Sequence, residues 1–130
     1  MAVKMKTPPL SGAQLEIMNI LWERGEATVA EVWRTLSARR SVARNTVLTL
    51  MTRMEAKGWL RHRAEGNAFH YMPAAAREGA LGQIVARMVD TAFGGSAEGL
   101  VMALLDGRGV SKGEAARIRA LIQKAEGARK

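Results

Sequence analysis

The stretch from residue 42 to residue 58, VARNTVLTLMTRMEAKG, constrains the fold more than any other part of the chain. Apolar side chains recur in it at helical spacing, which predicts one helix with a buried stripe formed by Val47, Leu50, Met51 and Met54. The opposite face is polar and includes threonines, whose β-branched side chains lower helix propensity. Helix stability does not explain that choice, so we interpret the polar face as a contact surface.

Short polar side chains with arginines beside them suit a helix that lies in the major groove of DNA. A threonine-rich surface helix without any partner is the alternative for this stretch alone. The charge balance favours an anionic partner, because 20 Lys+Arg against 12 Asp+Glu give a formal net charge of +8. Such a partner is most often nucleic acid and sometimes an anionic membrane surface. The candidate DNA-binding residues of this helix are Arg44, Asn45, Thr46, Thr49, Thr52 and Arg53.

Two capping boxes come before this helix in the chain. Ser11 with Gln14, and Thr28 with Glu31, have the spacing at which a hydroxyl and a longer polar side chain satisfy each other's backbone N–H. Each predicts the start of a helix. A basic turn at residues 38–41 then leads into the helix described above, and two helices joined by a tight turn are typical of a helix-turn-helix.

A β-hairpin is predicted directly after the second of these two helices. Residues 59–63 and 68–72 alternate in character, and Gly66-Asn67 lies between them. A helix-turn-helix followed at once by a hairpin makes a winged helix. The candidate DNA-binding residues of the wing are Arg61, Arg63 and Asn67.

The register of this hairpin can be predicted from its apolar residues. If Leu60 and Tyr71 both face the core, a loop of about four residues pairs His62 with Phe69. His62 and His70 then lie on opposite faces. Because the chain also lacks cysteine, we expect no metal site.

Three amphipathic helices are predicted after Pro73, at about 75–93, at 96–105, and from Ser111 onward. They carry more apolar surface than they can cover alone, and pairing with the same segment of a second chain is the economical solution. The expected dimerisation residues are Leu81, Ile84, Val85, Met88, Leu100, Val101, Leu104, Leu105, Ile118, Leu121 and Ile122.

We therefore expect a mostly α fold with a small β-hairpin wing. The predicted parts are a flexible arm at 1–9, a winged helix-turn-helix domain at 10–73 and a three-helix dimerisation domain at 74–130. No apolar run reaches the ~18 residues that cross a bilayer, and no signal-peptide core follows the first lysines, so we expect a cytoplasmic protein without membrane insertion. No spacing pairs a nucleophile with a base and no glycine-rich phosphate loop occurs, so we expect neither catalysis nor a cofactor.

Three segments carry a family resemblance: LSGAQLEIMNILWERGEATVAEVWRTL, NTVLTLMTRMEAKGWL and EGNAFHYMP. With them, nearly the whole chain resembles the penicillinase repressors of the BlaI/MecI type, which are related to copper-responsive repressors. The resemblance implies a homodimeric winged-helix repressor with a C-terminal helical dimerisation arm and a palindromic operator. It also implies DNA contacts by Thr46, Thr49 and Arg53.

The chain departs from the family pattern at several positions. Leu48 stands where several relatives have a polar or basic DNA-contacting residue, so the operator sequence can differ. Asn67 replaces an arginine that often follows the wing glycine. Penicillin-sensing members are cleaved at an Asn-Phe bond through a sensor-linked protease, and the aligned pair here is Ala103-Leu104. The copper-sensing branch uses a cysteine-rich tail, which this chain lacks.

Three functional hypotheses follow from these observations. The first is a dimeric, sequence-specific repressor of a double-stranded DNA operator, relieved by proteolysis at Ala103-Leu104 if that departure is tolerated. The second is a winged-helix repressor controlled by a small molecule, and the third is a winged-helix module for protein contacts. Salt dependence separates the third from the others, because each phosphate contact contributes a log–log slope of about −0.9.

Overall fold

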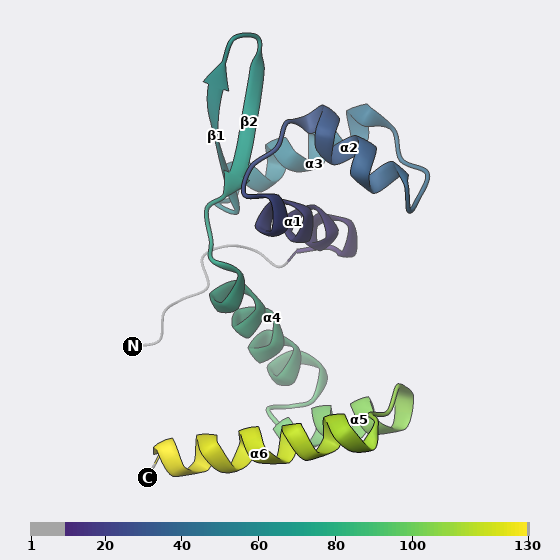
Figure 1. Cartoon of the computed structure of the whole chain (residues 1–130), viewed down its shortest axis with the longest axis vertical. Coiled ribbons are helices and arrows are strands. Elements are labelled where there is room, and N and C mark those ends of the chain that lie inside the picture. The colour runs from purple at the N-terminus through teal and green to yellow at the C-terminus, as the bar shows by residue number, and fades with distance from the viewer. Residues whose placement is uncertain (1–9, 130) are drawn as a thin grey trace. The chain divides into compact units, whose positions relative to one another are not determined.

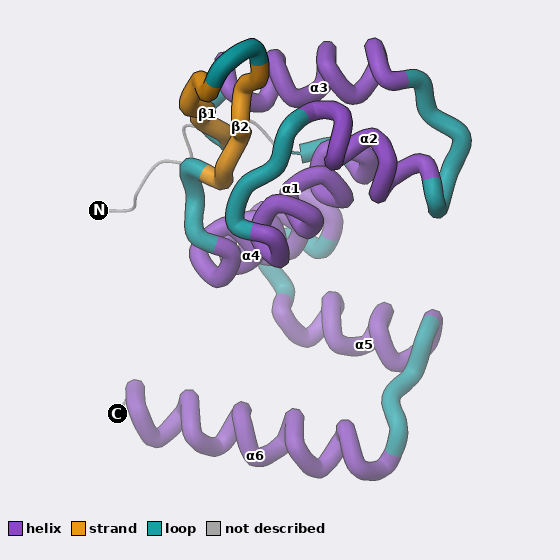
Figure 2. The backbone as a smooth tube through the Cα atoms, turned by 45° about the horizontal axis from the view of Figure 1, so that its top comes forward, coloured by secondary structure: helices purple, strands orange, loops and turns teal. Residues whose placement is uncertain are grey.

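The computed structural model describes residues 10–129, which form two compact units (Figures 1 and 2). The first unit extends to Val85 and the second begins at Ala86. This division falls inside helix α4 (Arg77–Ala92), whereas the boundary expected from the sequence lies at Pro73, before that helix. The arm expected at 1–9 lies outside the described residues.

The first unit opens with three helices, α1 (Gly12–Arg24), α2 (Val29–Ser37) and α3 (Arg44–Ala56), of which α2 and α3 form the helix-turn-helix. Both predicted capping boxes are formed, at the starts of α1 and α2, with reciprocal bonds of 2.9–3.2 Å. Helix α3 begins two residues after the start of the predicted stretch, and its N-cap is Ala43, which has no side chain able to cap. Its first backbone N–H groups therefore have no side-chain acceptor.

Strands β1 (Leu60–Glu65) and β2 (Ala68–Pro73) form the antiparallel wing. The predicted register was wrong, because His62 pairs with Tyr71 and not with Phe69. The loop has only two residues, with Gly66 at φ 62° in the first central position, as hairpins of this length prefer. A shift of two residues keeps every side chain on its predicted face. Leu60 and Tyr71 are accordingly both buried, as predicted.

The connector between α1 and α2 forms an additional backbone pairing with strand β2 of the wing. Ala27 and Tyr71 form an isolated antiparallel bridge, in which each backbone N–H donates to the other's carbonyl at 3.0 and 2.8 Å. This bridge joins β2 to the helix-turn-helix backbone, so the base of the wing has a fixed position on the first unit.

A single hydrophobic core lies between the three helices and the base of the wing. The predicted stripe of α3 is confirmed, because Val47, Met51 and Met54 are buried and Leu50 packs against the cluster. No polar or charged side chain among residues 10–127 is buried in it. The buried residues are Ile17, Met18, Ile20, Leu21, Ala27, Val32, Leu36, Val47, Met51, Met54, Trp59, Leu60, Tyr71 and Ala80.

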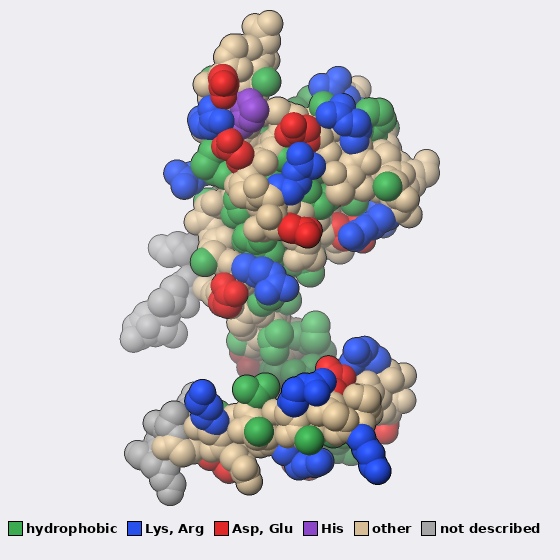
Figure 3. Space-filling model, viewed as in Figure 1, with side chains coloured by type: hydrophobic (Ala, Val, Ile, Leu, Met, Phe, Trp, Pro, Cys, Tyr) green, Lys and Arg blue, Asp and Glu red, His purple; other side chains and the backbone are tan. Residues whose placement is uncertain are grey.

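The second unit contains the end of α4, then α5 (Ala97–Gly107) and α6 (Lys112–Arg129). Gly94 and Gly95 have positive φ values of 57° and 88° and end α4, as the sequence predicts. Ser96 caps α5, which runs two residues past its predicted end, and the Ser111 hydroxyl accepts a bond from the Glu114 N–H at 3.1 Å. No residue from 86 to 127 is buried, and hydrophobic side chains reach the surface of these helices (Figure 3).

Among residues 10–129, no single helix is long and apolar enough to cross a bilayer, and α4 with α5 meets those requirements only as a bent pair.

Candidate nucleic-acid interface

Helix α3 presents two exposed flanks, one on either side of its buried stripe. The outward flank carries four of the six residues of this helix predicted to contact DNA. They line a shallow hollow with Leu50 and are Asn45, Thr46, Thr49 and Arg53. All four are exposed. No carboxylate among the described residues pairs with Arg53, so its guanidinium is available to an external acceptor.

The second flank of α3 faces the wing and behaves differently. Thr52, predicted to contact DNA, shares a hydrogen bond with the phenol of Tyr71. Burial raises the pKa of Tyr71, the nearby Glu55 carboxylate raises it further, and the Thr52 bond opposes both effects. Thr52 is exposed, and its hydroxyl lies beside the Tyr71 phenol of the wing.

A histidine completes this junction between helix and wing. Nδ1 of His62 lies 2.8 and 2.7 Å from the two carboxylate oxygens of Glu55, and its ring stacks on Phe69 with centroids 4.1 Å apart. Glu55 was not predicted as part of the site. Its position three residues after Thr52 was the available signal, because residues so spaced share a helix face.

The outer face of the wing carries an ion cluster around Arg63. Its guanidinium makes two bonds to Glu26, at 3.1 and 2.8 Å, and one to Glu65 at 2.6 Å. These bonds to Arg63 hold the pKa values of both carboxyls below their usual range. Arg63, predicted to contact DNA, is exposed, but these two carboxylates already neutralise its charge. Arg61 has no such carboxylate partner among the described residues.

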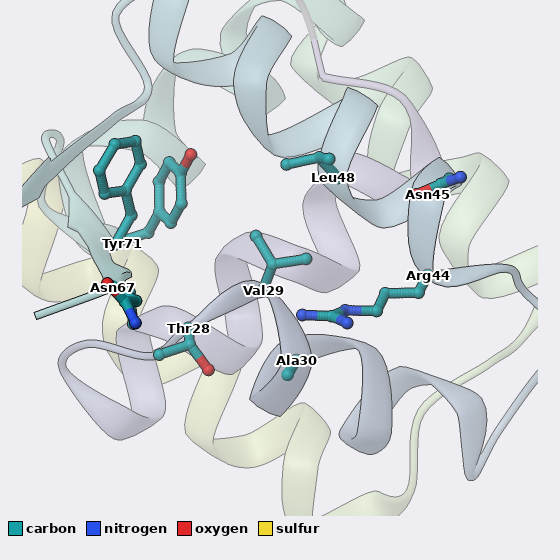
Figure 4. Close-up of a pocket in the computed structure, with 10 residues that line it drawn as sticks. Thr28, Val29, Ala30, Arg44, Asn45, Leu48, Asn67 and Tyr71 are labelled. Carbon is teal, nitrogen blue, oxygen red and sulfur yellow. The ribbon is translucent and has the colours of Figure 1, made fainter.

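A groove of about 530 Å³ lies between α3, the start of α2 and the wing (Figure 4). Arg44 and Leu48 both reach into it from α3, and the predicted wing residue Asn67 stands on the opposite side. Its lining residues are Thr28, Val29, Ala30, Arg44, Asn45, Leu48, Asn67, Ala68, Phe69 and Tyr71.

None of the residues that line this groove carries a carboxylate. Arg44 contributes a positive charge to the groove. The groove thus suits an anionic chain rather than a cation. Nothing local in the sequence indicated that the start of α2 would face the wing, because that contact is made by tertiary packing.

The residues predicted to pair two chains remain largely uncovered in this single chain. The most exposed of them are Val85, Met88, Val101, Leu104, Leu105, Leu121 and Ile122. Leu81, Ile84, Leu100 and Ile118 are partly covered. The Ala103-Leu104 pair lies in the interior of α5, with both residues exposed.

Comparisons with known proteins agree with this geometry. A family model described as penicillinase repressor matches residues 10–124. The penicillinase repressor of Bacillus licheniformis is 35% identical over 68 residues, which cover 52% of this chain and 53% of that protein. The chain therefore spans about half the length of this relative. Transcriptional regulator BlaI of Mycobacterium tuberculosis is 29% identical over 120 residues, which cover 91% of this chain and 86% of that one.

Two solved structures resemble the first unit. The solution structure of the DNA-binding domain of the repressor BlaI has a TM-score of 0.52 at 32% identity, and covers 57% of this chain and 90% of that one. The Bacillus licheniformis BlaI monomer, solved in complex with the blaP half-operator, has a TM-score of 0.50 at 33% identity, and covers 56% and 89%.

Proposed function

The chain belongs to the penicillinase repressor family, whose members are transcriptional repressors and not enzymes, and we propose that it binds a palindromic DNA operator as a homodimer. In this proposal it acts in the cytoplasm, needs no cofactor, and blocks polymerase when bound over a promoter. The observation that carries the proposal is the outward flank of α3, which exposes Asn45, Thr46, Thr49 and Arg53, a cation with no carboxylate partner among residues 10–129.

Helix α3 is the element proposed to enter the major groove. Arginine can donate two bonds to guanine O6 and N7, and asparagine can pair with the adenine edge, so Arg53 and Asn45 are the proposed base readers. Thr46 and Thr49 allow close approach and donate to base edges or phosphates. The complex of a relative's monomer with a half-operator supports this use of the winged helix.

The wing is proposed to bind the DNA backbone. Arg61 and Asn67 are exposed and are the proposed phosphate donors. Arg63 and Thr52 are assigned a mainly positioning role, because Arg63 is held by two carboxylates and Thr52 by the Tyr71 phenol.

The C-terminal helices are proposed to pair two copies of the chain. Support comes from large apolar side chains that the single chain leaves exposed, such as Leu105 at 50% and Leu121 at 66%. A two-fold axis between protomers would place two α3 helices on half-sites about an integral number of helical turns apart.

Release by proteolysis at the Ala103-Leu104 bond, through a sensor-linked protease, belongs to the same proposal. The bond lies within α5, so cleavage requires local unwinding of that helix. Mass spectrometry of the repressor recovered from cells treated with a β-lactam should find a fragment ending at Ala103. Recovery of only the intact chain under derepressing conditions would contradict this route.

The test of the main proposal is selection of genomic fragments by the purified full-length protein, followed by gel-shift titration. We expect an enriched inverted repeat, binding that survives competitor DNA, and an affinity that falls steeply with salt, with a log–log slope of about −0.9 per phosphate contact. The absence of any enriched sequence would overturn the proposal. An affinity for the fragments that is independent of salt would overturn it as well.

A further inference from the structure

Leu48 is a large apolar residue that α3 leaves 44% exposed. It lies beside the buried stripe, on the flank that faces the wing, one turn after Arg44 and one turn before Thr52. A single exposed leucine is ordinary on a protein surface. This one, however, projects into the groove between α3 and the wing, among residues already proposed to meet DNA (Figure 4).

The chemistry around Leu48 restricts what can occupy the groove. Arg44 and Asn45 carry hydrogen-bond donors beside it, Asn67 stands opposite, and no lining residue is acidic. An occupant must therefore offer an apolar group to Leu48 and anionic or hydrogen-bonding groups around that point. On the major-groove edges of DNA, the C5 methyl group of thymine is the apolar group that distinguishes one base from another.

We propose that Leu48 contacts the C5 methyl group of one thymine in each operator half-site and so contributes to sequence specificity. This inference rests on the proposed operator binding. A cytosine at the same place lacks the C5 methyl group, so it offers Leu48 no such apolar contact. Leu48 thus favours thymine by contact with its methyl group.

The size of the effect follows from the burial of one methyl group. Removing a single buried methyl from the DNA should weaken binding about fourfold, which corresponds to ~0.8 kcal/mol. Truncating the leucine should abolish the distinction between DNA with and without that methyl. A residue that only positions α3 would change affinity for both DNAs equally.

The experiment uses the full-length protein and the operator enriched by genomic selection. Each thymine of one half-site is replaced in turn by deoxyuridine, which lacks only the methyl group, and binding is measured by fluorescence anisotropy. For the wild-type protein, one position should show the fourfold loss. Leu48→Ala should bind the thymine and deoxyuridine probes equally at that position, while still discriminating against unrelated DNA.

Phe69→Ala is the matched control, because Phe69 is an exposed apolar residue on the wing side of the same groove. It should preserve the ratio between the two probes. A ratio that persists in Leu48→Ala would overturn the inference, as would an operator in which no thymine shows a methyl effect with the wild-type protein. Both results leave the proposed function standing. Failure to enrich any operator would overturn both.

Discussion

The two units of this chain contain similar apolar residues, but the first unit buries them and the second leaves them exposed. Among its described residues, 10–85, the first unit buries fourteen hydrophobic ones, from Ile17 to Ala80, and completes its core with its own helices and wing. In the second unit no residue from 86 to 127 is buried. The difference teaches that amphipathic periodicity predicts a helix in both units, but only the first has enough neighbouring elements to cover the apolar face.

The exposed side chains of the second unit are large enough to matter energetically. Full burial of a leucine or isoleucine contributes roughly 1.5–3 kcal/mol, so Leu105, Leu121 and Ile122, each at least half exposed, leave much of that unrealised. Folding of the first unit should therefore be a property of one chain, and folding of the second a property of two.

The largest expected effect comes from placing a charge on the proposed pairing surface. Leu104→Glu should separate the dimer, because a carboxylate buried against apolar side chains is strongly unfavourable. Loss of bivalent binding should lower operator affinity by about 10²-fold or more. Sedimentation velocity and gel shift measure the two effects, and Leu104→Met is the matched control. A Leu104→Glu variant that still sediments as a dimer would remove α5 from the interface.

A matched pair of leucine truncations compares the two units directly. Leu21→Ala, at a fully buried position, should lower the free energy of unfolding by about 2–5 kcal/mol at any protein concentration. Leu121→Ala should cost less, and its melting temperature should depend on protein concentration. Thermal unfolding at two concentrations tests this. An effect of Leu121→Ala that is independent of concentration would show that its contacts are within one chain.

The two units should also differ in how much an arginine of each contributes to DNA binding. Arg53→Ala should weaken operator binding by about 1–3 kcal/mol if Arg53 reads a base. Arg119→Ala removes the same charge from an exposed position on α6 and should have little effect. Equal losses in gel-shift titrations of the two variants would mean that only net charge matters, and would remove Arg53 from the proposed base readers.

The smallest expected effect concerns the ion cluster that fixes the wing. Arg63 lowers the folded-state pKa of Glu26 and Glu65 below 4.5, so the cluster stabilises the fold above that pH. This contribution is lost as pH falls through the lowered folded values. Glu26→Gln should flatten the acid side of the stability–pH curve, with only a slight change near neutral pH, since exposed pairs contribute little. If the stability of Glu26→Gln fell at acid pH as steeply as that of the wild-type protein, the cluster would have no role in stability.

The local features of the first unit follow from short-range sequence signals. The spacing of Ser11 with Gln14 and of Thr28 with Glu31 predicts two helix starts, and both capping boxes are formed. The stripe of α3 was predicted for the same reason, because its period of 3.6 residues is read within one helix. The family resemblance found in these segments is confirmed by the family model that matches residues 10–124.

Tertiary packing decided the features that join distant parts of the chain. The register of the wing depends on the length of its loop. A two-residue loop and a longer one both place Leu60 and Tyr71 on the buried face, so the alternation of faces does not distinguish the two registers. Arg63 meets Glu26 across 37 positions in the sequence, and no short-range pattern encodes that pairing. By itself, the sequence determined the order of the helices and strands and which faces are apolar, because those depend on near neighbours. Only the packed structure determined which polar residues of α3 and the wing remain free for a partner, because their competitors come from other elements.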